Sequence, residues 1–194
     1  MASNFWTDSQ LQPKRAFRYL LDFDPVGQQS LQYLAKSVTK PTFELSSTPH
    51  QYLNHTFYYP GRVTWQPITV TLIDTTQQGM NVSEAIMRVL DKSGYRQPAQ
   101  NDNRTISKSQ AVASGLSQIQ IKVIDSKGDV VETWSLKNAF IQRAEFGNLD
   151  YASEEVTNVT LTIQYDYAFI DVVNPNGGPS QIPGIGDAGP EQNI

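Results

Sequence analysis

Residues 158–170 read NVTLTIQYDYAFI, and apolar and polar side chains alternate along this stretch. Every second residue is apolar or aromatic: Val159, Leu161, Ile163, Tyr165, Tyr167 and Phe169. The residues between them are polar or small: Asn158, Thr160, Thr162, Gln164, Asp166 and Ala168. Because successive side chains of a β-strand point to opposite faces, the stretch predicts one long strand with a buried face and a face exposed to water.

The same alternation occurs in other parts of the chain. Residues 118–123 (QIQIKV) and 130–136 (VVETWSL) repeat it, and the segment between them contains Gly128, which adopts positive φ at little cost. This pattern predicts a hairpin. Further strands are expected at residues 16–24, 35–46, 62–74 and 138–146, with Pro41 reducing part of one of them to an edge or bulge. The fold class is therefore mainly β, an antiparallel sandwich or barrel.

One helix is expected beside the sheets. Asn81 is a good N-cap, Glu84 occupies the capping-box position three residues later, and Gly94 suits the C-terminal end. The apolar stripe of this helix consists of Ile86, Met87, Val89 and Leu90, and it predicts core packing against the sheet. Residues 97–117 are polar and predict a long exposed connection.

The organisation predicted is one domain with two extensions. We expect an N-terminal arm at 1–15, a β domain at 16–170 and a flexible tail rich in Pro and Gly at 171–194. The N-terminus lacks the features of a signal peptide, and no stretch approaches the ~20 apolar residues of a membrane span, so folding in the cytoplasm is expected. The chain has no cysteine, which excludes disulfides and thiolate metal sites.

Charge is unevenly distributed along the chain. Residues 1–143 contain all 15 Lys and Arg and 11 Asp and Glu, whereas residues 144–194 contain 8 acids and no base. This asymmetry suits a subunit whose basic surface meets an acidic surface of a neighbour. Charge that merely keeps the tail soluble explains it equally well.

No motif for catalysis or cofactor binding stands out. The two histidines, His50 and His55, are five residues apart, which does not fit a helical zinc pair. The sequence Gly184-Ile185-Gly186 lies in the tail and not between a strand and a helix, so it does not indicate a phosphate loop. Glu154 and Glu155 are adjacent and lack apolar neighbours that would raise one pKa. We therefore predict no enzyme activity, no cofactor and no metal.

The most unusual segment is aromatic. Residues 52–61 read YLNHTFYYPG, with polar groups at the ends of apolar rings. The segment is too polar and too bounded by proline for a core, but it suits an intersubunit loop, because Tyr is enriched at interfaces. A monomeric carbohydrate-binding module that uses Trp65, Trp134 and the tyrosines as platforms is the main alternative. A hydrolase that uses Glu154 or Glu155 is a third.

Four segments resemble the tail tube proteins of contractile-tailed bacteriophages: SVTKPTFE (37–44), YLNHTFYYPGR (52–62), WQPITVTL (65–72) and VTLTIQYDY (159–167). The resemblance covers roughly residues 16–170. It implies a β-sandwich with one flanking helix, whose sheets continue across the subunits of a hexameric ring. It also implies that rings stack into an inner tail tube with a sheath outside, baseplate or initiator and terminator proteins at the ends, and DNA passing through the channel without specific binding. The location implied is the virion.

The resemblance also implies roles for particular residues. The segment from His50 to Gly61 would reach the adjacent ring, so the expected contact residues are His50, Tyr52, Leu53, Asn54, His55, Phe57, Tyr58, Tyr59 and Arg62. The polar face of the 158–170 strand fits a wide, water-filled channel lined by Thr160, Thr162, Gln164 and Asp166. The same face would also suit contact with an outer sheath. Tube subunits of other contractile injection systems look similar, and so does a tube initiator or terminator.

Overall fold

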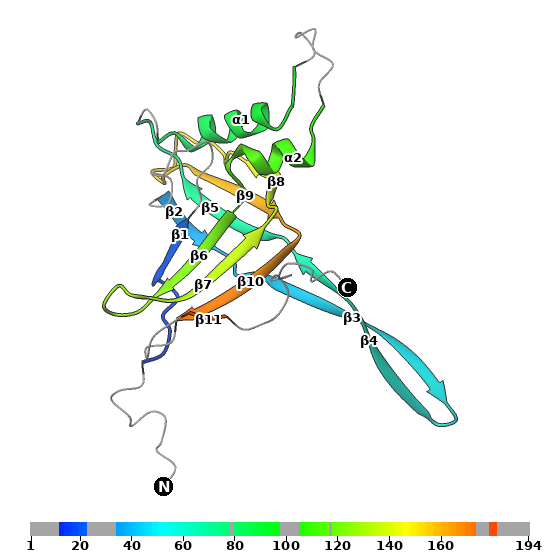
Figure 1. Cartoon of the computed structure of the whole chain (residues 1–194). Helices are drawn as coiled ribbons and strands as arrows, with labels where there is room; N and C mark the ends of the chain where they lie inside the picture. The colour runs from blue at the N-terminus through cyan, green and yellow to red at the C-terminus, as the bar shows by residue number, and fades with distance from the viewer. Residues whose placement is uncertain are drawn as a thin grey trace, which may run out of the picture.

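The computed structural model describes residues 12–22, 34–77, 80–97, 105–116, 118–173 and 179–181. Its elements are β1 (Tyr19–Asp22), β2 (Ala35–Val38), β3 (Thr42–Tyr52), β4 (His55–Gln66), β5 (Ile68–Ile73), α1 (Val82–Lys92), α2 (Lys108–Ala111), the π-helical turn Val112–Leu116, β6 (Gln118–Ile124), β7 (Val130–Lys137), β8 (Phe140–Glu145), β9 (Asn158–Gln164), β10 (Tyr167–Val173) and β11 (Pro179–Gln181). Strands dominate, as the sequence predicts (Figure 1).

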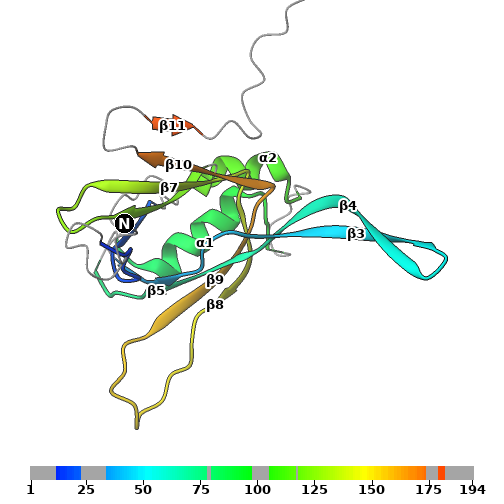
Figure 2. The same ribbon diagram turned by 90° about the horizontal axis from the view of Figure 1, so that it is seen from below.

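Two sheets enclose the core. One has the strand order β1-β6-β7-β10-β11 and the other β2-β5-β9-β8, and all of their pairings are antiparallel. Within the described part of the chain, β3 and β4 pair only with each other, and they project away from the two sheets (Figures 1 and 2). The predicted antiparallel sandwich is confirmed, and the pair β3–β4 is an addition to it.

The buried face of each sheet consists of alternate residues of its strands. On β9, Val159, Leu161 and Ile163 are fully buried while the residues between them are partly exposed. Apolar residues of β5, β6 and α1 complete the same cluster. The alternation in the sequence therefore correctly predicts the inner face of β9, because each strand contributes every second side chain to the core.

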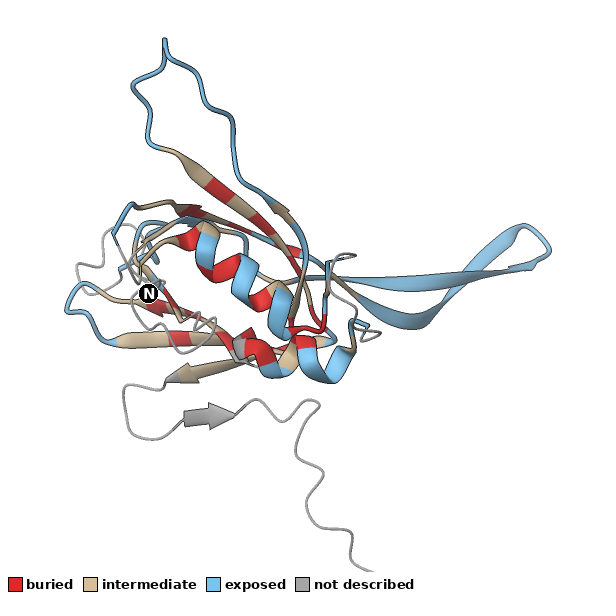
Figure 3. Cartoon of the chain, turned by 90° about the horizontal axis from the view of Figure 1, so that it is seen from above, coloured by how far each residue is buried: buried red, intermediate tan, exposed pale blue. Residues whose placement is uncertain are grey.

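The helix α1 closes one end of the sandwich. Asn81 accepts a hydrogen bond from the backbone N–H of Glu84 at 2.8 Å, and Gly94 has a φ of 101° just beyond the helix. The buried face consists of Val82, Ala85, Ile86 and Val89, whereas Met87 is exposed. Figure 3 shows α1 running across the opening between the sheets, with its buried residues turned inward. The predicted helix is confirmed, with a stripe that excludes Met87.

The prediction of one strand over residues 158–170 is wrong. The chain turns at Tyr165–Asp166, so β9 belongs to one sheet and β10 to the other. Beyond the turn the alternation changes phase, since Ala168 is buried and Phe169 is not. The turn is held by the N–H of Asp166, which donates to the carbonyl oxygen of Lys137 at 3.0 Å.

Two predicted irregular segments contain regular structure. Within 97–117, Ser107 caps α2, and Ala111 and Leu116 are buried in the core region, so this part is not an exposed connection. In the predicted tail, β10 continues through Asp171–Val173 and β11 pairs with it. Residues 182–194 of the tail and residues 1–11 of the predicted arm lie outside the described residues.

Candidate functional site

The projecting pair β3–β4, called the arm below, contains the aromatic segment identified in the sequence. All of β3 and most of β4 are exposed, and only Trp65 and Gln66 at the base of the arm are partly buried. The arm is a two-stranded ribbon that turns at Leu53–Asn54, where Leu53 has a φ of 50°. The expectation of a loop is therefore wrong for this segment, because it lies in two strands that are joined by ten cross-strand residue pairs.

A bulge divides the arm into a proximal and a distal part. Leu45 pairs with Val63, but the next pair is Ser47 with Pro60, so β4 contains one extra residue. The hydroxyl of Ser46 fills the gap and accepts a hydrogen bond from the N–H of Arg62 at 2.9 Å. A Cβ on Gly61 would lie 2.4 Å from the Ser46 Oγ, so a larger residue here would displace the Ser46 hydroxyl.

The register assigns the aromatic residues of the distal arm to two faces. One face contains the cross-strand pairs Thr48–Tyr59, His50–Phe57 and Tyr52–His55, and the other contains Ser47–Pro60, Pro49–Tyr58 and Gln51–Thr56. The rings of His50 and Tyr59 contact at a centroid distance of 6.4 Å. Tyr58 and Tyr59, adjacent in sequence, are exposed on opposite faces at 70% and 59%. Eight of the nine predicted contact residues lie in the distal arm or at its turn, and Arg62 lies at the bulge.

Aromatic contacts anchor the base of the arm to the core. Trp65 contacts Phe43 at a ring-centroid distance of 5.4 Å and Tyr165 at 6.0 Å. Trp134 lies on β7 in the other sheet and donates its indole N–H to Glu132. The two tryptophans are packed against the core cluster, so they do not form the flat exposed platform that a carbohydrate-binding module requires.

A polar face covers the outside of the β2-β5-β9-β8 sheet. It contains three of the four predicted channel residues, Thr160, Thr162 and Gln164, and the register places Thr71 and Thr69 of β5 beside the two threonines. The threonines of β5 were missed in the sequence, although their alternation with Ile68, Val70 and Leu72 could have revealed them. The contact of this face with a channel stays a prediction.

Asp166, the fourth predicted channel residue, lies beyond the end of β9. Its carboxylate accepts hydrogen bonds from Lys108 Nζ at 2.7 and 2.8 Å and from Asn138 Nδ2 at 2.8 Å. Lys108 and then Asn138 lower the pKa of this carboxyl. Asp166 therefore connects α2 to the turn between the sheets and does not share a strand face with the threonines.

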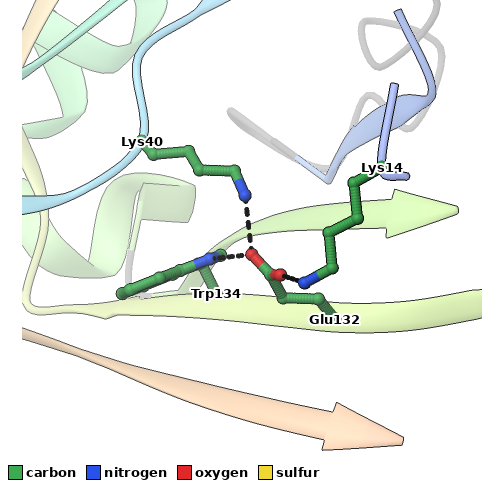
Figure 4. Close-up of polar contacts among 4 residues, drawn as sticks. All are labelled: Lys14, Lys40, Glu132 and Trp134. Carbon is green, nitrogen blue, oxygen red and sulfur yellow. Dashed lines mark hydrogen bonds and ion pairs between the residues drawn. The ribbon is translucent and has the colours of Figure 1, made fainter. Parts of the chain in front are cut away.

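A buried carboxylate joins three separate segments (Figure 4). Glu132 on β7 is hydrogen-bonded to Lys14, to Lys40 Nζ at 2.7 Å and to the indole N–H of Trp134. Burial alone would raise the pKa of the Glu132 carboxyl, but these three donors outweigh it and hold the pKa at about 2. Lys40 lies two residues before β3, so this cluster links the base of the arm to the opposite sheet. In the sequence, Glu132 occupies the same alternate positions as Val130, Trp134 and Leu136, and a charged residue on that apolar face is the signal for a buried carboxylate.

A second projection lies between β8 and β9. Residues 146–157, called the acidic loop below, extend away from the sheet (Figures 2 and 3). The backbone N–H of Ala152 donates to the carboxylate of Asp150 at 3.0 Å, which forms a turn near the tip. Leu149 and Tyr151 are exposed there, and Glu154 and Glu155 follow on the exposed return segment.

The described residues give little support to the alternative of a hydrolase. Among them, no group of three or more His, Asp or Glu side chains could hold a metal ion. His50 and His55 lie on the exposed arm, and Glu154 and Glu155 lie on the exposed acidic loop. None of the helices in the described part of the chain has the length and apolar character of a membrane span.

Comparisons with known proteins agree with this architecture. No protein-family model and no curated protein matches the sequence. Among solved structures, the chain is similar to a chain of the PVC sheath-tube complex of an extracellular contractile injection system in the extended state. The TM-score is 0.57 at 16% identity, over 86% of this chain and 99% of that one.

Two further solved structures are similar. A chain of the tube-terminating cap of the anti-feeding prophage has a TM-score of 0.58 at 16% identity, over 84% of this chain and 93% of that one. A chain of the baseplate of the same particle has a TM-score of 0.55 at 15% identity, over 82% and 95%. The chain therefore has the fold found in tube and cap assemblies of contractile injection systems, which confirms the predicted fold class.

Proposed function

We propose that this protein is a structural subunit that assembles into hexameric rings and that these rings stack into the inner tube of a contractile particle. The exposed aromatic residues of the arm are the main support for this proposal. A two-stranded hairpin alone is at best marginally stable in water, because it buries little apolar surface. Here its distal part exposes Tyr52, Phe57, Tyr58 and Tyr59, and no other described element of the chain covers them. Contact with a second copy of the chain would bury these aromatic side chains.

The partners proposed are those of such a tube: a sheath around it and baseplate, initiator or terminator proteins at its ends. The similarity to chains from a sheath-tube complex, a tube-terminating cap and a baseplate supports this set. The proposed location is the virion or another contractile particle. The role is mechanical, so we propose no enzymatic activity and no cofactor.

For the conducted polymer, we propose DNA in a phage tail. Thr160, Thr162 and Gln164 would line the channel and would offer phosphates no cation, so binding would gain nothing from counterion release. On the adjacent strand, Arg143 pairs with Glu145. A tube of a non-phage contractile injection system is the second candidate, and the PVC and anti-feeding prophage similarities favour it.

The proposal is tested by imaging purified protein. Negative-stain electron microscopy at increasing protein concentration should show rings with sixfold symmetry and hollow tubes, and light scattering should rise cooperatively with concentration. Because salt screens attraction between charged surfaces, the protein is also imaged at low ionic strength. Particles that stay monomeric under both conditions would overturn the proposal.

A further inference from the structure

A basic cavity lies between the segment that precedes β1 and the strands β2 and β6. Its volume is about 270 Å³. Its apolar lining includes Val38, Ile121 and Val123, and its cationic lining consists of Lys14, Arg15, Arg18 and Lys40. The guanidinium of Arg18 also lies over the ring of exposed Phe17, 5.5 Å from its centroid.

The charge in this cavity is only partly neutralised within the chain. Lys14 and Lys40 share the single carboxylate of Glu132. Arg15 and Arg18 form no ion pair with any described residue, and Arg15 is exposed. A cavity with apolar lining and with guanidinium groups that form no ion pair to a described residue fits an acidic segment that also carries an apolar or aromatic side chain.

The acidic loop has these properties. Glu154 and Glu155 are exposed and form no ion pair in the described part of the chain, and the loop contains no Lys or Arg. Leu149 is 89% exposed at the tip beside Tyr151. The loop makes no hydrogen bond or ion pair with residues 14–19 of its own chain, as far as the chain is described.

We propose that the acidic loop of one copy docks in the basic cavity of a second copy, with Glu154 and Glu155 facing Arg15 and Arg18. The two surfaces differ and lie on separate parts of the chain. A contact between different surfaces is heterologous, so it propagates into a closed ring or an open stack and does not stop at a twofold dimer. This inference rests on the proposed tube function and assigns it a specific intersubunit contact.

Charge reversal on each side tests the contact in the full-length chain. The variants Arg15→Glu/Arg18→Glu and Glu154→Lys/Glu155→Lys should each raise the critical concentration for assembly by about tenfold or more, because like charges would face each other. Combining all four substitutions should return the critical concentration to within about threefold of the wild-type value, since complementarity is restored. Light scattering measures assembly, and circular dichroism verifies folding.

The matched control is Lys92→Glu/Lys127→Glu. It changes the net charge by the same amount as the arginine variant, at two exposed positions that do not line the cavity. It should assemble at the wild-type concentration. The inference is overturned if the folded arginine variant also assembles as the wild type does, or if the combined variant is not rescued. Neither of these results would contradict the proposed tube function. That proposal fails only if the wild-type protein itself does not assemble.

Discussion

Glu132 is hydrogen-bonded to two lysines that are distant in the sequence: Lys14 is 118 residues away and Lys40 is 92 residues away. Only 4% of the Glu132 side chain is exposed, so its charge depends on these donors rather than on water. Removing one partner of a buried hydrogen-bonded charge leaves the others unsatisfied, which costs more than the bond itself contributes. The cluster therefore fixes the segment before β1 and the base of the arm onto β7.

Replacing Glu132 by Gln should lower the free energy of unfolding by about 2 kcal/mol at pH 7, since charge-assisted hydrogen bonds are lost. The pKa of this carboxyl is about 2 in the folded chain and 4.5 ordinarily. A lowered pKa stabilises the fold fully above the ordinary value, and this contribution disappears as the pH falls from about 4.5 towards 2. The difference between wild type and variant should shrink over the same range.

Urea denaturation at pH 7, 4 and 2.5, at a protein concentration below assembly, measures this difference. Glu154→Gln is the control, because Glu154 is exposed and forms no ion pair with a described residue. A gap between wild type and Glu132→Gln that stays constant down to pH 2.5 would contradict the assigned cluster.

At the scale of elements, the bulge determines which aromatic residues of the arm act together. The extra residue in β4 places Tyr59 on the face of His50 and Phe57, and Tyr58 on the opposite face beside Pro49. Without the bulge, the distal strand pairs would be shifted by one residue and every side chain in the distal part of β4 would change face relative to β3. The two faces of the arm can therefore contact different neighbours.

Replacing Tyr58 and Tyr59 together by Ala should abolish stacking while the domain remains folded, because interface aromatics commonly contribute ~2 kcal/mol or more each. The single variants should differ, since each removes a ring from one face only. We expect a free-energy loss of about 2 kcal/mol for the face that is buried between copies and a negligible loss for a face that stays in water. Sedimentation velocity measures assembly. Normal polymerisation of the double variant would show that the distal arm is not an interface.

At the scale of the whole molecule, the arm contributes little to the core. The residues between Leu45 and Val63 are exposed, whereas Trp65 is the part of the arm that packs on the core cluster. A folded body without the distal arm is therefore expected to be stable, because its buried apolar surface is unchanged.

Replacing residues 46–62 by Asn-Gly tests this separation. It joins Leu45 to Val63, which are directly paired, through a two-residue turn that suits a hairpin. We expect a protein that no longer stacks into tubes and whose free energy of unfolding, measured on the monomer at low concentration, lies within about 0.5 kcal/mol of the wild-type value, as for surface changes. Size-exclusion chromatography should show no stacked tubes. A large loss of stability would mean that the arm belongs to the core, and normal tubes would remove the arm from the proposed interface.

The sequence by itself determined the elements whose signals are local. The alternation of Val159, Leu161 and Ile163 predicted the inner face of β9, Gly128 predicted the turn of a hairpin, and Asn81 predicted the start of α1. It also identified the aromatic residues of the arm from their composition. Each of these signals lies within one strand, turn or helix end, where neighbouring residues are sufficient to define the geometry.

Only the tertiary structure decided where the chain leaves one sheet for the other and which residues meet across the fold. The turn at Asp166 depends on Lys108 and Asn138, the Glu132 cluster joins three distant segments, and Leu116 is buried although its neighbourhood is polar. The faces of the arm likewise depend on a cross-strand bulge. Contacts between residues far apart in the chain leave no periodic pattern in the sequence, so their positions follow from packing and hydrogen bonding in the folded molecule.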